Sequence, residues 1–403
     1  MKFTDRNFIP LILGGDINTY SVARAFYEEY QVKTTVMGKY KSGPSYGSRI
    51  VNYIPNEQIT EDATFLKQVN DFAKEHSNKK IILMGAGDHY LNLVARNIDH
   101  LSDNIIAPFI SYELMDNLQR KDYFYELCEK TGVDYPDTVV VTKEMGLDFE
   151  MNFSYPVILK SSESVRYWDY PFPGQEKVYT IHNREELDRT ITEIYEAGYP
   201  ENLIIQDMIP GNDEYMYVLT SYSDHTGKVK MMCLGHVLLE EHTPTGKGNH
   251  AVIITAHNEE LMKQAQEFLE NIDYVGYSNF DVKYDYRDGK YKFFEINTRQ
   301  GRSNYYVTGS GFNIAKYLVE DYIEHKELDF EVSKDPHLWI VVPKSVAFKY
   351  VKEKENLDLM QKLFDEGKYV NPLFFKPDLP FRRFLHLVKT HFDHYAKYRK
   401  YYQ

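Results

Sequence analysis

The sequence has little cysteine, no long apolar run and no excess of basic residues. Its two cysteines, Cys128 and Cys233, show no metal-ligand spacing and lie near no nucleophile motif, so we expect two buried thiols in a reducing compartment. The longest apolar run, Phe8 to Leu13, is too short for a signal-peptide core or a membrane span. A formal net charge of −13 argues against nucleic acid as a general partner, because phosphate neutralisation needs a basic surface. These absences predict a cytoplasmic protein that binds no nucleic acid.

Apolar residues are nevertheless abundant enough for real cores. They make up 43% of the 403 residues, a length that suggests two or three domains. In the first part, apolar strands that end in glycine (8–15 and 79–88) are each followed by a helical pattern (18–30 and 89–101). This alternation predicts βαβ units with a parallel sheet. The stretch GGDINT lacks the full G-x-G-x-x-G fingerprint, so we interpret its glycines as turn residues.

From residue 134 the pattern becomes rich in strands. A helix predicted over 114–132 leads into this region, and 279–285 with 291–297 reads as a hairpin closed by an Asp-Gly turn. Further strands are predicted at 155–162, 202–209, 214–223 and 228–239, and further helices at 184–198 and 258–272. We expect a mixed fold, α/β at the N-terminus and α+β after it.

The last residues, 382–403, are basic and aromatic in an otherwise acidic protein. An exposed terminal helix with a solvated charged face explains this composition. A partner-docking element or a peripheral contact with the membrane surface explains it too.

The stretch FFEINTRQGR (293–302) carries the strongest chemical signal. Glu295 and Asn297 lie two positions apart on a predicted strand and therefore point to one face, which Asp281 can reach from the paired strand. Two carboxylates and an amide oxygen suit Mg²⁺, which otherwise takes water and substrate phosphates as ligands. The alternative is that the carboxylates form salt bridges with Arg299 or Arg302.

Weaker signals precede this stretch. Lys160 ends the apolar run PVILK and suits phosphate binding as a point charge, whereas Lys121 on the preceding helix is unremarkable alone. The stretch QDMIPGNDE (206–214) is a strand with an acidic turn, where a backbone edge can pair with adenine and a carboxylate can hold ribose hydroxyls.

The order of these features resembles the ATP-grasp superfamily of carboxylate–amine ligases over about residues 8–325. The resemblance implies an ATP-grasp fold with a Rossmann-like pre-ATP-grasp domain (1–118), an ATP-grasp domain (119–330) and a C-terminal extension (331–403). It implies ATP and Mg²⁺ as cofactors. The residue roles that it implies are phosphate binding by Lys121 and Lys160, adenine binding by Gln206, Asp207 and Ile209, ribose binding by Asp213 or Glu214, magnesium binding by Asp281, Glu295 and Asn297, and contact with the acyl phosphate and the amino-acid carboxylate by Arg299 and Arg302.

Three stretches (197–213, 229–244 and 279–303) are similar to the D-aspartate ligases of peptidoglycan cross-bridge synthesis. That branch uses ATP to activate the side-chain carboxylate of D-aspartate as an acyl phosphate, which the lysine ε-amine of the precursor pentapeptide then attacks. The alternatives are a ligase for another amino acid or small carboxylate, and a non-catalytic nucleotide-binding sensor or scaffold.

The chain departs from the superfamily pattern in the segment expected to cover the phosphates. Residues 161–177 are aromatic and poor in glycine, so no residue there is identified as the one that closes over the γ-phosphate. This segment and 240–250, with Gly246 and Gly248, are the candidates for mobile loops that keep water from the acyl phosphate.

Overall fold

The computed structural model describes residues 1–163, 166–244 and 246–402. Residues 164–165 of the candidate loop 161–177, residue 245 of the candidate loop 240–250, and residue 403 lie outside the described residues. The chain divides into two compact units. Unit 1 comprises Met1–Tyr112, Asn212–Asn279 and Asn297–Gln403, and unit 2 comprises Glu113–Gly211 and Phe280–Ile296. The predicted C-terminal extension therefore belongs to the same unit as the N-terminus.

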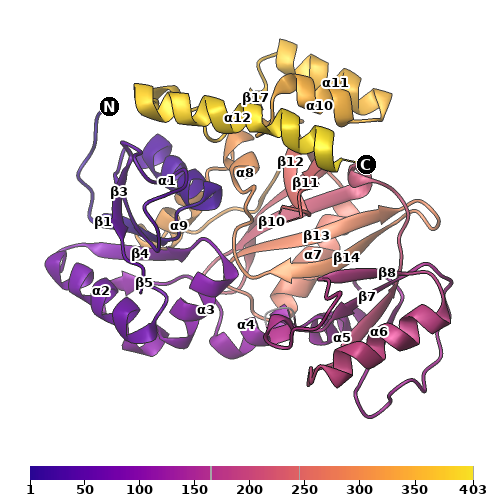
Figure 1. Cartoon of the computed structure of the whole chain (residues 1–403). Coiled ribbons are helices and arrows are strands. Elements are labelled where there is room, and N and C mark those ends of the chain that lie inside the picture. Colours follow the sequence, from indigo (N-terminus) through magenta and orange to yellow (C-terminus); the bar gives the residue numbers. More distant parts are fainter. Residues whose placement is uncertain (164–165, 245, 403) are drawn as a thin grey trace. The chain divides into compact units, whose positions relative to one another are not determined.

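The N-terminal part of unit 1 is the expected parallel sheet with helices (Figure 1). Its strand order is β3-β2-β1-β4-β5, and each neighbouring pair is parallel. The strands are β1 (Phe8–Leu13), β2 (Thr34–Gly38), β3 (Val51–Pro55), β4 (Lys80–Gly85) and β5 (Ile105–Ile106), and the helices are α1 (Ile17–Tyr30), α2 (Asp62–Glu75) and α3 (Asp88–Arg96). The helix predicted over 89–101 ends at Arg96, and a 3₁₀ turn, η1 (Ile98–His100), follows it.

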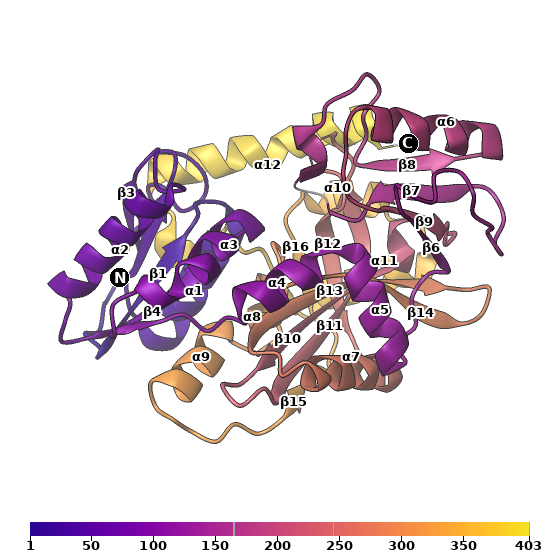
Figure 2. The ribbon, with the colours of Figure 1, turned by 90° about the horizontal axis from the view of Figure 1, so that it is seen from below.

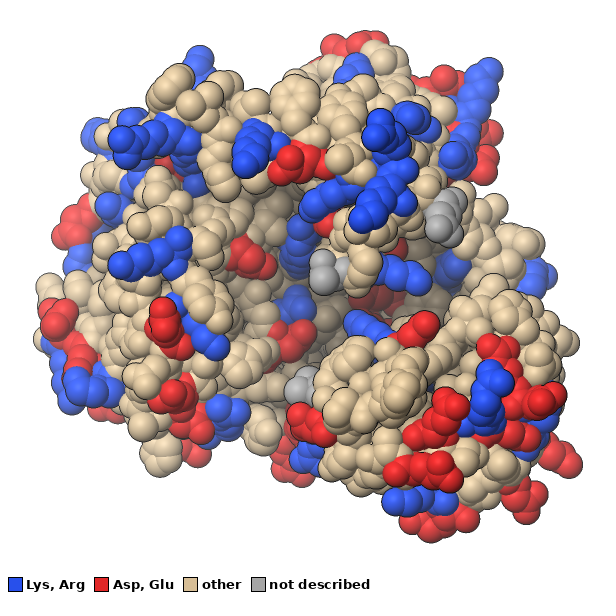
Figure 3. Space-filling view, viewed as in Figure 1, with Lys and Arg blue, Asp and Glu red and all other residues tan. Residues whose placement is uncertain are grey.

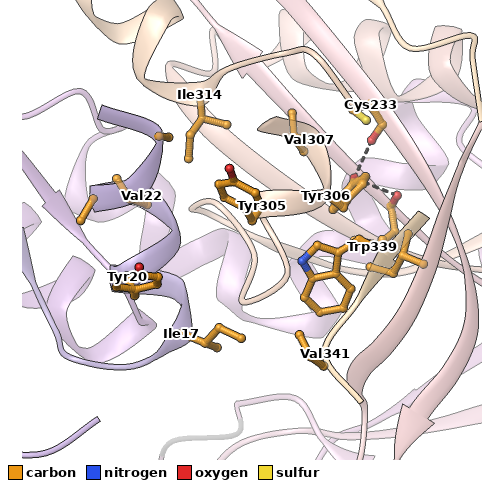
Figure 4. Close-up of a cluster of buried hydrophobic side chains, with 14 of the residues drawn as sticks. Ile17, Tyr20, Val22, Cys233, Tyr305, Tyr306, Val307, Ile314, Trp339 and Val341 are labelled. Carbon is orange, nitrogen blue, oxygen red and sulfur yellow. Dashed lines mark hydrogen bonds between the residues drawn. The ribbon is translucent and has the colours of Figure 1, made fainter. Parts of the chain in front are cut away.

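A second sheet in unit 1 has the strand order β10-β11-β12-β16-β17, with β15 (Glu331–Val332) beside β11. The strands are β10 (Met216–Ser223), β11 (Val229–Glu241), β12 (Asn249–Ala256), β16 (Leu338–Ile340) and β17 (Tyr369–Val370), and the helices are α7 (Glu259–Asn271), α8 (Tyr305–Gly309), α9 (Ile314–Tyr322), α10 (Lys344–Tyr350), α11 (Lys354–Asp365) and α12 (Phe381–Tyr401). Figure 4 shows the core between the α1 and α8 helices and this sheet, with Tyr20, Tyr305 and Trp339 buried in it. The buried hydroxyl of Tyr306 donates to the carbonyl of Cys233 at 2.6 Å, so this hydroxyl is satisfied. Both cysteines are buried and free, as predicted.

Unit 2 contains an antiparallel sheet of order β6-β9-β7-β8, covered by α6 (Figure 2). Its elements are α4 (Tyr112–Gln119), α5 (Lys121–Thr131), β6 (Thr138–Val141), β7 (Val157–Ser161), β8 (Val178–Ile181), α6 (Arg184–Glu196) and β9 (Leu203–Asp207). The predicted hairpin is present as β13 (Gly276–Asp285) and β14 (Lys290–Asn297), which run from one unit into the other. Gly289 in its turn has φ +75°, a conformation that favours glycine.

The single helix predicted over 114–132 is wrong, because it is two helices. Arg120 has extended backbone angles (φ −85°, ψ 123°), so α4 ends before it and α5 begins at Lys121. The amide of Lys121 donates to the carbonyl of Ser162 at 3.0 Å instead of to a carbonyl of α4. A tertiary hydrogen bond thus replaces a helical one and fixes where α5 starts.

The C-terminal helix α12 is docked on unit 1 along one face. Arg383, Leu387 and Tyr398 on that face are buried, and the Tyr398 hydroxyl donates to the carbonyl of Glu240 at 2.7 Å. None of the helices in the described parts of the chain is long and apolar enough to cross a membrane.

Candidate active site

The predicted phosphate lysines of unit 2 lie in one polar cluster. In β7, Val157 and Leu159 point into the core beneath α6, and in β9 Leu203 and Ile205 do the same. Strand alternation therefore presents Lys160 and Gln206 on the opposite face of the sheet.

Tyr125 on α5 joins these strands to the hairpin. Its hydroxyl accepts a hydrogen bond from Lys160 Nζ at 3.0 Å, and it lies 2.7 Å from the carbonyl oxygen of Phe294 and 3.2 Å from Gln206 Oε1. One hydroxyl thus fixes the ammonium group of Lys160 against both the sheet and β14.

Lys160 is a buried cation without an ion pair. The residue is 8% exposed, and no carboxylate within the described ranges lies within ion-pair distance of its ammonium group. Burial, reinforced by the positive charge of Lys121, lowers the pKa of Lys160 to about 7. A phosphate next to Nζ would supply the missing negative charge. The site therefore fits a polyphosphate.

Glu295 lies beside the second predicted lysine. Its Oε2 is 3.6 Å from Lys121 Nζ, and its side chain is 40% exposed. Burial alone would raise the pKa of Glu295, but Lys121, Lys160 and Lys177 together hold it below its ordinary value. The carboxylate is therefore ionised at neutral pH, as a metal ligand must be. Asp281 is half-buried on β13, between the buried Phe280 and Val282.

The predicted adenine-binding residues also belong to unit 2. Gln206 is buried and donates to Thr138 Oγ1 at 2.7 Å, whereas the Asp207 carboxylate is paired with Arg287. Ile209 is buried, and its carbonyl accepts from Lys283 Nζ at 3.0 Å. The side chains of Gln206 and Asp207 at the end of β9 are thus engaged, and so is the main-chain carbonyl of Ile209.

The two candidate ribose carboxylates, Asp213 and Glu214, are in unit 1. Asp213 Oδ2 accepts from the amide of Glu240 and from His242 Nε2, each at 2.8 Å. Glu214 is buried and accepts from the amides of Lys352 and Glu353 and, at 3.1 Å, from Asn356 Nδ2. Glu214 therefore caps the N-terminus of α11, where a negative charge is favourable.

Asn297 ends β14, and Arg299 and Arg302 follow it, all three in unit 1. Arg299 donates from Nε to Asp88 Oδ1 at 2.7 Å and from Nη2 to Asp88 Oδ2 at 3.1 Å, and its Nη2 also contacts Asn297 Oδ1 at 3.4 Å. Gln300 between the arginines donates to the carbonyl of Gly85 at 3.1 Å. The loop is thereby anchored at the end of β4, and Arg299 is held in one orientation.

Sequence reasoning missed three residues of these clusters. Tyr125 follows Lys121 by four positions on α5, a spacing that places both on one helix face. Asp88 is the last residue of the predicted strand-and-glycine stretch 79–88, which gave no sign of a functional side chain. Lys177 closes the candidate loop 161–177. The helical spacing was a usable signal for Tyr125, whereas nothing local points to the other two.

Comparison with known proteins shows the family to which the chain belongs. No family model matches the chain. A protein named D-aspartate ligase, from Enterococcus faecium (strain Aus0004), is 39% identical over 411 residues, which cover 99% of this chain and 97% of that protein. The chain belongs to the D-aspartate ligase family.

Solved structures agree in fold at low identity. The N5-carboxyaminoimidazole synthetase of Staphylococcus aureus complexed with ADP has a TM-score of 0.60 and 15% identity over 99% of this chain and 98% of that chain. The L-amino acid ligase of Bacillus licheniformis has a TM-score of 0.55 and 16% identity over 79% of this chain and 75% of that chain.

The D-aspartate ligase family assignment confirms two predictions, the ATP-grasp fold and an ATP-dependent carboxylate–amine ligase. It leaves the alternative of a non-catalytic sensor without support.

Proposed function

We propose that this chain activates the side-chain carboxylate of D-aspartate with ATP and joins it to the lysine ε-amine of the peptidoglycan precursor pentapeptide. The observation that carries the proposal is the 39% identity to a protein named D-aspartate ligase, which extends over nearly the whole of both chains. The buried, uncompensated Lys160 in unit 2 supports the ATP-dependent step.

A carboxylate and an amine do not condense in neutral water, because the carboxylate lacks a leaving group. In the proposed reaction the aspartate side-chain oxygen takes the terminal phosphoryl group and ADP leaves. The amine nitrogen then attacks the acyl carbon, and inorganic phosphate leaves with both electrons of the C–O bond. Lys121 and Lys160 stabilise phosphate charge by position and electrostatics, and Tyr125 holds Lys160 in place. We assign contact with the acyl phosphate and the amino-acid carboxylate to Arg299 and Arg302.

The remaining nucleotide assignments are proposals of the same kind. We assign the adenine edge to Gln206, Asp207 and Ile209, and the ribose to Asp213 or Glu214. The hydrogen bonds of Glu214 to α11 make Asp213 the better of these two.

Mg²⁺ fits the donor set of the hairpin. No group of three or more His, Cys, Asp or Glu suited to a metal occurs in the portion of the chain that the structure describes. Asp281, Glu295 and Asn297 would therefore hold Mg²⁺ only together with phosphate and water oxygens, which is the coordination that this ion prefers. When bound, the ion neutralises phosphate charge.

The test is ADP release by the purified protein with ATP, Mg²⁺ and the lysine-containing UDP-muramoyl pentapeptide. D-Asp, L-Asp, D-Glu, Gly, L-Ala and L-Ser are supplied in turn, and mass spectrometry identifies the product. We expect turnover with D-Asp and one added aspartyl residue. Turnover with another amino acid alone would replace the substrate, and no turnover with any of them would overturn the proposal.

We also propose a cytoplasmic enzyme that contacts the membrane through the outward face of α12. Phe392 is 59% exposed and Leu385 50% exposed, and Tyr395 extends this apolar face. Basic side chains lie over α12 on the face seen in Figure 3, although the chain as a whole is acidic. Apolar and basic groups on one helix face suit an anionic lipid surface. Co-sedimentation with vesicles of phosphatidylglycerol, but not of phosphatidylcholine alone, is the expected result, and Phe392→Ser should weaken it.

A further inference from the structure

Unit 1 contains a cavity of about 1220 Å³ beneath α12. One wall is the loop of residues 41–47, another is the inner side of α12, and Arg302 and His250 also line it. Pockets for small ligands usually measure about 300–1,000 Å³. The cavity is thus much larger than a single amino acid requires.

Three cations in the cavity wall have no partner. The side chains of Lys41, Arg302 and Arg382 form no ion pair or hydrogen bond with any residue in the described ranges. Two other cations of the wall are engaged, since Lys397 pairs with Glu241 at 3.2 Å and Arg383 lies 3.5 Å from Asp378. The wall also contains three carboxylates, those of Asp16, Glu241 and Asp393. Its five lysine and arginine side chains outnumber them, and an anionic ligand would balance the excess positive charge.

The wall also contains buried polar atoms without hydrogen bonds. Arg383 is 7% exposed, yet its Nη2 finds no hydrogen-bond acceptor among the described residues. On the next turns of the same helix, Nδ1 of His394 is buried and has no hydrogen-bond partner among the described residues. Such atoms are rare in folded proteins unless a ligand or water satisfies them. Nearby, Val341, Leu373 and Phe374 supply an apolar surface.

We propose that this cavity binds the amine acceptor through its anionic part, the stem-peptide carboxylates and the diphosphate attached to the sugar. The inference rests on the proposed function, because Arg302 of the wall is the residue assigned next to the acyl phosphate. A ligand that reaches Arg302 is a reactant and not a remote effector. The cavity has far more room than the amino acid alone would fill. Its apolar surface suits the methyl groups of a peptide that contains alanine.

The acceptor chemistry has two sources, since the same peptide and diphosphate occur on a nucleotide and on a lipid carrier. The experiment therefore compares the UDP-linked pentapeptide, the lipid-linked pentapeptide in detergent and the free pentapeptide. The cations Lys41 and Arg382 are changed to alanine, singly and together. Both side chains are exposed and form no hydrogen bond or ion pair with the described residues, so the variants should fold. Lys389→Ala is the matched control, because Lys389 lies on α12 and does not line the cavity.

Hydroxylamine separates this inference from the proposed function. It replaces the acceptor as a small amine and traps activated aspartate as the hydroxamate. We expect Lys41→Ala/Arg382→Ala to raise the KM for the UDP-linked pentapeptide at least tenfold. The ratio of acceptor-dependent to hydroxylamine-dependent rate should fall by the same factor. Lys389→Ala should change neither by more than twofold.

The outcomes are distinct. An acceptor KM within twofold of wild type in the double variant would overturn the cavity assignment, even with full hydroxamate formation. No D-aspartyl hydroxamate from the wild type would instead overturn the proposed function, and titration of the UDP-linked pentapeptide against both proteins would then decide the cavity. If the double variant raises the KM for the UDP-linked pentapeptide but not for the free pentapeptide, the cations contact the diphosphate. If it raises the KM for both, the cations contact the peptide carboxylates. A larger rise in KM for the lipid-linked than for the UDP-linked pentapeptide identifies the lipid-linked form as the preferred acceptor.

Discussion

The hydroxyl of Tyr125 holds the ammonium group of Lys160 at 3.0 Å, in a buried position with no carboxylate in ion-pair distance among the described residues. A buried ammonium without a counter-ion is unfavourable in the empty protein. The arrangement is therefore a preformed binding site for a negatively charged group. Lys160 is the residue on which the ATP-dependent chemistry most clearly depends.

Replacement of Lys160 should lower the activity without lowering the stability of the protein. Lys160→Met should reduce ADP release at least 100-fold, because a preorganised cation next to the transferring phosphate is lost. The free energy of unfolding should stay equal or rise, because the desolvated charge is removed. Steady-state kinetics and urea denaturation check the two statements. Lys143→Met, an exposed change in unit 2, should alter neither. A fully active Lys160→Met would remove the residue from the mechanism.

The affinity for ATP should depend on pH through the same residue. The pKa of Lys160 is about 7, and a bound phosphate stabilises its charged form. Above pH 7 the free protein must take up a proton to bind, so the Kd for ATP should rise by up to about tenfold per pH unit between 7 and 9. Lys160→Arg should abolish this slope, because arginine stays charged throughout the range. An equal slope in wild type and variant would assign it to another group.

The magnesium assignment predicts a specific change in metal dependence. Glu295→Gln should raise the Mg²⁺ concentration for half-maximal ADP release at least tenfold, because a neutral amide is a weaker ligand than a carboxylate. Glu126→Gln, which removes an exposed carboxylate of α5 paired with Lys130, is the matched control. An unchanged Mg²⁺ requirement with a folded protein would sink the assignment of Glu295 as a ligand.

Arg299 and Asp88 in unit 1 should contribute to the reaction rate as a coupled pair. Arg299→Ala should lower the rate at least 100-fold, and Asp88→Asn about tenfold, because Asp88 positions the guanidinium without touching the reactants. The double variant should be no slower than Arg299→Ala alone, since the role of Asp88 is exercised through the arginine. Additive losses in the double-mutant cycle would show that Asp88 acts separately.

Glu214 should matter for stability. Glu214→Ala leaves the amides of Lys352 and Glu353 at the start of α11 without this acceptor and should lower the free energy of unfolding by about 1–3 kcal/mol. Urea denaturation measures the loss, and Glu353→Ala, an exposed change in the same turn, should have little effect. A stable Glu214→Ala variant with a raised KM for ATP would return the residue to ribose binding.

Much of the fold was predictable because it depends on local patterns. Apolar runs that end in glycine predicted β1 and β4, the apolar run PVILK predicted β7 with Lys160 near its end, and the Asp-Gly turn predicted the β13–β14 hairpin. Side-chain periodicity and turn chemistry act within a few residues of one another, so the sequence itself records them. The order of the lysines and the hairpin oxygens likewise sufficed for the superfamily.

The partners of these residues were decided only by the tertiary structure. Asp88 meets Arg299 across 211 positions, and Glu214 meets Glu353 across 139. The break at Arg120 depends on a carbonyl 42 residues later, that of Ser162, which accepts the Lys121 amide. The α12 helix was predicted, but the cavity beneath it requires the loop at 41–47 to lie opposite. Such contacts depend on how the elements pack, and no local pattern in the chain specifies that.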